Sequence, residues 1–101
     1  VNPRDAGLHV ALAEQLAALG AQADARASLA RAIALKPADA HTLLRIATFF
    51  EERLHQRTEA LSWLEQALAR GQTWREIDNE PLLRELRQDP RFVALKSRHT
   101  S

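Results

Sequence analysis

The side chains best suited to metal binding or proton transfer are four histidines: His9, His41, His55 and His99. A zinc site on a helix needs ligands about three or four positions apart, because that spacing puts them on one face. No two of the histidines have that spacing, and His9 and Glu14 lie five positions apart, on different faces of a helix. The histidines are interpreted as surface or groove residues, and no metal site is expected.

Other candidates for catalysis also lack the partners that they need. Glu51 and Glu52 are adjacent, and neighbouring side chains of a helix point about 100° apart, so they are interpreted as a solvated helix end rather than an acid–base pair. Ser28 and Ser62 have no histidine placed to activate them, and the sequence contains no nucleophile-elbow or glycine-rich phosphate motif. We expect no catalytic residue, no cofactor and no enzymatic activity.

Composition narrows the class of protein and the class of partner. The 101 residues suffice for one small domain, the net charge is +1, and cysteine is absent. Opposite charges are interspersed, whereas a nucleic-acid surface would gather its Lys and Arg in a stripe. No apolar run approaches the about 20 residues that a membrane span needs. We expect neither nucleic-acid binding nor membrane insertion.

The beginning of the sequence indicates a piece of a longer protein. It starts at Val1 rather than at methionine, and Pro3 already stands where a helical unit would end. The lack of a signal peptide then carries little weight. The localisation is therefore unknown, with the cytoplasm favoured.

Proline and aspartate mark where one helix ends and the next begins. Pro3 to Ala6 and Pro37 to Ala40 repeat one pattern, 34 residues apart, in which proline stops a helix and aspartate caps the next. Alanine and leucine dominate the chain and favour helices. Gly20 and Gly71 are expected to end helices. Further N-caps are expected at Thr58, Thr73, Asn79 and Asp89. Helices are predicted at residues 6–19, 23–36, 40–53, 59–70, 74–77, 80–87 and 90–96.

The spacing of apolar and small residues predicts which helix faces are buried. Leu8, Leu12, Leu16 and Leu19 recur at helical spacing and form the predicted apolar face of the first helix. Small residues are expected where paired helices cross, at Ala13 and Ala25 in the first pair and at Ala47 and Ala60 in the second. The two tryptophans, Trp63 and Trp74, are predicted to pack around the last pair rather than to stack on a ligand.

In this register the sequence resembles the tetratricopeptide repeat family, whose unit is a helix-turn-helix of 34 residues. The matching positions of the first unit are Leu12, Ala13, Leu16, Ala25, Leu29, Ala32 and Pro37. Those of the second unit are Leu43, Ile46, Ala47, Phe50, Ala60, Leu64 and Ala67, with one residue inserted in the turn before its second helix. A closing proline is missing near Gln72, where the repetition stops.

The resemblance implies an all-α fold, a right-handed α-α superhelix of antiparallel helix pairs with a short helical C-terminal cap. Residues 1–5 would end a preceding repeat, residues 6–39 and 40–72 would form two repeats, and residues 73–101 would cap the last pair. The last segment also looks like the closing segment of some bacterial repeat proteins, including the tails of signalling enzymes.

The functional candidate that the resemblance implies is a concave groove lined by the first helix of each pair, in a non-catalytic scaffold that binds a protein or peptide. A clamp for a C-terminal carboxylate is not expected, because the family's Lys and Asn positions hold other residues. The alternative is a regulatory or oligomerising tail of a larger signalling enzyme, which self-associates through the uncapped N-terminal face of residues 6–19. The predicted groove residues are Val10, Glu14, His41, Leu44, Arg45, Thr48 and Glu52.

Overall fold

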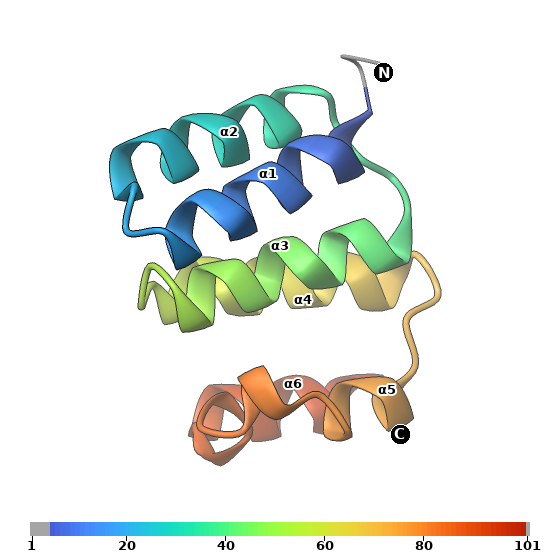
Figure 1. The fold of residues 1–101 in the computed structure, drawn as a ribbon. Coiled ribbons are helices and arrows are strands. Elements are labelled where there is room, and N and C mark those ends of the chain that lie inside the picture. Colours follow the sequence, from blue (N-terminus) through green and yellow to red (C-terminus); the bar gives the residue numbers. More distant parts are fainter. Residues whose placement is uncertain (1–4, 101) are drawn as a thin grey trace.

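The computed structural model describes residues 5–100, with side chains described for residues 5–98. Within this range the chain is all-helical, as predicted, and Figure 1 shows the helices as stacked layers. The pair α1 and α2 lies at one end, the pair α3 and α4 follows, and the remaining elements close the other end. The elements are Ala6–Ala18 (α1), Gln22–Ala34 (α2), Ala40–Glu52 (α3), Arg57–Ala69 (α4), Trp74–Asp78 (α5), the 3-10 turns Pro81–Leu83 (η1) and Leu86–Gln88 (η2), and Pro90–Thr100 (α6).

Side-chain caps set the start of α1, α3 and α5, as predicted. The Gly7 amide donates to Asp5 Oδ1 at 2.9 Å, and the Thr42 amide donates to Asp39 Oδ2 at 2.8 Å. The Thr42 hydroxyl also donates to Asp39, and these hydrogen bonds lower the pKa of that carboxyl. The Glu76 amide donates to Thr73 Oγ1. Each cap gives a partner to a backbone N–H group that the helix itself leaves unpaired.

The helix ends show one correct and one wrong prediction. Gly20 and Gly71 take φ values of +84° and +110°, the left-handed conformation predicted for a residue that follows a helix. The predicted cap at Thr58 is wrong, because α4 begins one residue earlier, at Arg57. His55 takes the left-handed position in the turn before α4, with φ at 54°, although it is not a glycine.

Small residues bring the paired helices together. Ala13, Ala25, Ala47 and Ala60 are at most 1% exposed, which confirms their predicted place in the core. The first pair packs around one buried cluster with Leu29, and the second pair shares another cluster with the C-terminal elements. Trp63 packs against both clusters. Alanines at a crossing let the two helix backbones of one pair approach closely. The contact between one pair and the next is made by the larger side chains around the alanines.

The buried face of α1 differs from the prediction. Val10 and Ala13 are fully buried, whereas Leu8 and Leu12 are each 44% exposed and Leu19 is 82% exposed. The three leucines lie about 160–180° around the helix axis from Val10, at about 100° per residue. Because α1 packs on its neighbours through its small side chains, the leucines are turned outward. Only Leu16 of the predicted face packs against the core.

The C-terminal segment, residues 73–98, closes the far end of the stack. Ile77, Leu83, Leu86, Phe92 and Leu95 are buried against α3 and α4. Trp74 meets Phe92 edge to face, with ring centroids 5.7 Å apart, as expected for a tryptophan that packs rather than binds a ligand. The continuous helix predicted for residues 80–87 is wrong, and so is its cap at Asn79. Instead, Glu80 accepts from the Leu82 amide, and two 3-10 turns follow.

Candidate functional site

The predicted groove runs along α3, between α1 and the C-terminal segment (Figure 1). His41, Arg45, Thr48 and Glu52 recur along this helix at intervals of four, three and four residues, which puts them on one face. His41 and Glu52 are exposed, and Arg45 is partly exposed. The strip is therefore mainly polar.

Three of the predicted groove residues are not available to a ligand. Val10 is fully buried in the core of the first pair, with Ile46 and Phe49. Leu44 is buried in the second cluster, beneath the C-terminal segment. Thr48 is also buried, and its hydroxyl donates to the Arg45 carbonyl at 2.8 Å. These residues support the groove from below and do not line it.

Two further groove residues bind each other. Arg45 Nη2 lies 2.5 Å from Glu14 Oε1, which joins α3 to α1. Both side chains remain partly exposed, so the pair contributes about 0.2–1 kcal/mol to stability. The one basic residue predicted for the groove is therefore already paired with an acid of the neighbouring helix.

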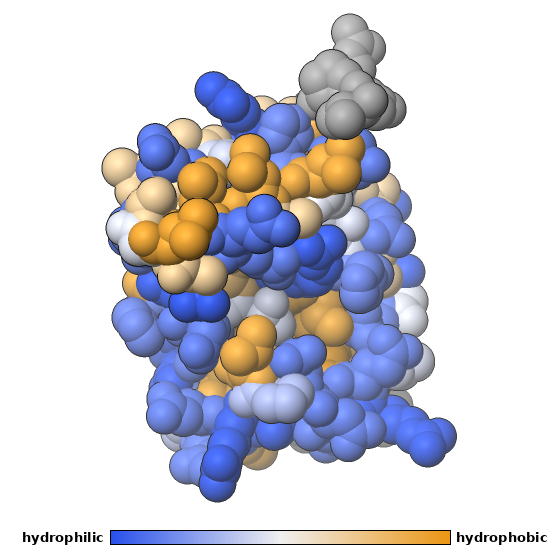
Figure 2. Space-filling model, viewed as in Figure 1, coloured by the Kyte–Doolittle hydropathy of each residue, from blue (hydrophilic) through white to orange (hydrophobic). Residues whose placement is uncertain are grey.

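The exposed apolar surface lies on α1 and on Leu19, the residue that caps its C-terminal end. Leu8, Leu12 and Leu19, which we call the leucine face, are three of the five large hydrophobic side chains that are exposed among residues 5–98. Figure 2 shows hydrophobic residues following α1 across the upper part of the molecule. The other two, Leu82 and Val93, belong to the C-terminal segment. A row of exposed leucines along one helix is typical of a surface that another polypeptide covers.

The sequence contained a signal for this surface that periodicity alone did not use. Leu8 precedes Ala13 by five residues, which places the two side chains about 140° apart on a helix. If Ala13 faces its partner helix at Ala25, as was predicted correctly, Leu8 must face largely away. The assignment of the crossing alanines and the assignment of the leucines to the core were therefore in conflict.

A network of charged residues fixes the C-terminal segment to the stack. Arg57 at the start of α4 binds both carboxylate oxygens of Glu51, at 3.1 Å and 2.8 Å. It also contacts Asp89, 3.4 Å away, which in turn pairs with Arg91. Arg91 donates to the Thr58 hydroxyl at 3.0 Å. Glu51 is only 7% exposed, so its interpretation as a solvated helix end was wrong, whereas Glu52 is exposed as expected.

These contacts shift the pKa values of their members. The hydrogen bonds that Arg57 donates to Glu51 are the largest cause that raises the pKa of Arg57 above its ordinary value, and Asp89 adds to the effect. Hydrogen bonds from Arg91, followed by that from Arg57, lower the pKa of Asp89 to about 2. Every member of the network has a charged or hydroxyl partner. The network therefore holds the C-terminal segment against α3 and α4, and it contains no unpaired acid or base for proton transfer.

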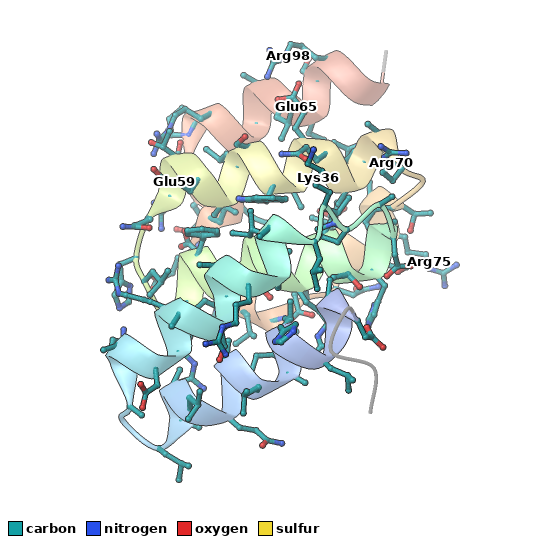
Figure 3. All side chains as sticks on the ribbon, turned by 90° about the horizontal axis from the view of Figure 1, so that it is seen from above. Lys36, Glu59, Glu65, Arg70, Arg75 and Arg98 are labelled. Carbon is teal, nitrogen blue, oxygen red and sulfur yellow. The ribbon has the colours of Figure 1, made fainter. Side chains whose placement is uncertain are left out.

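Surface depressions elsewhere are shallow and lined by charged residues. One lies between α4 and α6, and its volume is about 320 Å³. Figure 3 labels Glu65 and Arg98 at its edge, with Glu59 further along α4, on the side of the molecule opposite to α1. Another, of about 260 Å³, lies between the end of α3 and η1. It is lined by Glu51, Glu52, His55, Pro81, Leu82, Arg84 and Glu85.

The described residues contain no cluster of three His, Asp or Glu side chains that could hold a metal ion. Within residues 5–100, no helix is long and apolar enough to cross a bilayer. Comparisons with models of protein families, with curated proteins and with solved structures found no match to this chain.

Proposed function

We propose that this chain is a non-catalytic protein-interaction module, built like tetratricopeptide repeats, which binds another polypeptide along α1. The observation that carries the proposal is the leucine face, Leu8, Leu12 and Leu19. The helix α1 that carries the leucine face packs beside α3, where His41 and Glu52 are exposed. A bound helix would cover the leucines and meet polar groups at its edge, the usual arrangement of an interface core and rim.

The leucines offer enough free energy for recognition but not for tight binding. Their exposed fractions together equal somewhat less than two fully exposed leucines, so covering them is worth about 3–5 kcal/mol. Association costs about 4–15 kcal/mol in lost freedom of motion. A partner must therefore contribute apolar surface of its own. An amphipathic helix that lays its apolar face against α1 meets this requirement.

A selection of displayed amphipathic peptides on the folded chain, followed by fluorescence anisotropy of the enriched peptides, tests the proposal. Leu12→Glu places a charge within the leucine face, and it should weaken binding at least tenfold. Leu82→Glu is the matched control, because Leu82 is 46% exposed against 44% for Leu12 but lies in the C-terminal segment. It should leave affinity unchanged.

Peptides that bind the Leu12→Glu variant as tightly as the unchanged chain would refute the assignment to α1. Leu44→Ala is unsuitable for this test. Because Leu44 is buried, its truncation would report stability rather than binding.

A further inference from the structure

The leucine face has the spacing of a coiled-coil seam. Leu8, Leu12, Gln15 and Leu19 follow one another at intervals of four, three and four residues, which is the alternation of a heptad repeat. Gln15 is exposed like the leucines on either side of it. Building on the proposed function, we propose that the polypeptide covering this seam is a second copy of the chain, with the two α1 helices antiparallel.

The order of residues in the seam is self-complementary in that orientation. A two-fold axis between Leu12 and Gln15 sets Leu8 opposite Leu19 of the second copy. The same axis sets Leu12 opposite Gln15 of the second copy. Every seam residue then has a counterpart, and the same patch serves both chains, as a two-fold interface requires. A parallel arrangement would instead set each Gln15 against the other in the middle of the seam.

The charges on α1 favour a copy of the same helix. Glu14 is the only acidic residue of Ala6–Ala18, and it is turned toward α3, where Arg45 binds it. Small side chains, Ala11 and Ala18, flank the seam on the side nearer α3. No carboxylate or guanidinium of α1 therefore faces its counterpart across the two-fold axis, and a second backbone can approach closely.

The helix α1 carries little charge along the seam. Ala6–Ala18 has no acidic residue in its first turn and no basic residue in its last turn. The carboxylate at its N-terminal end, that of Asp5, is occupied as the cap of the Gly7 amide. A strongly charged peptide therefore finds no opposite charge within Ala6–Ala18 along this seam.

A shallow depression of about 400 Å³ between α1 and α2 offers further surface that a second copy could cover. It is lined by His9, Arg31, Ala34 and Leu35. Leu16, which is partly buried, lies on the same side of α1.

Sedimentation equilibrium of the full chain, from about 10 µM to about 1 mM, tests whether a dimer forms. The average mass should rise toward twice the 11.3 kDa of one chain. Leu12→Glu should keep the mass at one chain throughout, whereas Leu82→Glu should associate like the unchanged chain. Circular dichroism confirms that each variant is folded. A chain that stays monomeric to the highest concentration overturns the proposal, and so does equal association of the Leu12→Glu variant.

Disulfide cross-linking tests the orientation, because the natural chain contains no cysteine. A mixture of Leu8→Cys and Leu19→Cys chains should give cross-linked dimers that contain one of each. The Leu8→Cys chain alone should give few disulfide-linked dimers. Abundant disulfide-linked dimers of that variant would overturn the antiparallel arrangement. If the chain is monomeric but selected peptides still bind along α1, the second copy is refuted and the proposed function stands. If the chain is monomeric and no selected peptide binds along α1, both the proposed dimer and the proposed function are refuted.

Discussion

Truncation of Val10 should destabilise the fold more than truncation of the larger Leu12. Val10 is fully buried, whereas Leu12 is 44% exposed. Val10→Ala removes two carbons from the core, at about 0.8 kcal/mol each, and leaves a cavity, so the total cost is about 2–3 kcal/mol. Leu12→Ala removes a side chain that is already half in water and creates no enclosed cavity, so it should cost about 1 kcal/mol or less. Leu19→Ala should cost almost nothing.

Urea unfolding followed by circular dichroism measures this order at a concentration low enough that association does not contribute. In thermal unfolding, Val10→Ala should lower Tm by about 8–24 °C, given about 4–8 °C per kcal/mol for a domain of this size. The leucine periodicity of the sequence predicts the opposite order, with a cost of about 2–5 kcal/mol for each leucine. If Leu12→Ala destabilises the chain as much as Val10→Ala does, the outward orientation of the leucine face is wrong.

Three other perturbations have expected outcomes. Arg57→Gln leaves the 7% exposed Glu51 without its bidentate partner, so it should cost about 1–2 kcal/mol in urea unfolding, more than the same change at the exposed Arg84. Because the pKa of Asp89 is lowered to about 2, its contribution to stability is fully present above about pH 4 and is lost as the pH falls toward 2. Tryptophan fluorescence, to which Trp74 of the C-terminal segment contributes beside Trp63, should change in this range as that segment loosens, and Asp89→Asn should flatten that part of the profile. Gly20→Ala should destabilise by about 1 kcal/mol because φ is +84°, whereas equal stability would show that the turn readily adopts another conformation.

Local chemistry made much of the fold predictable. The caps at Asp5 and Asp39 and the left-handed Gly20 and Gly71 depend on residues within a few positions, so the sequence pattern places them correctly. The crossing alanines could also be found, because only small residues permit that approach. The 80–87 segment failed because Pro81 and Glu80 favour a short capped turn over a continuous helix.

The candidate site was less predictable because it depends on how the helices face one another. Leucines at helical spacing identify an apolar face, but they do not say whether that face lies against the core or in solvent. The outward turn of Leu8 and Leu12 follows from the tight packing of α1 through Ala13. The pairs Glu14–Arg45 and Arg57–Asp89 join residues 31 and 32 positions apart, and no local pattern in one sequence reveals such partners.

Both the proposed peptide complex and the proposed dimer require α1 to be the binding surface of this chain. Amide chemical shifts of the isotope-labelled chain, recorded as its concentration is raised, test that claim residue by residue. The shifts should change along α1, around Leu8, Leu12 and Leu19, and on the adjoining part of α2, while those of α4 and α6 stay constant. Changes confined to α4 and α6, with α1 unaffected, would contradict the claim.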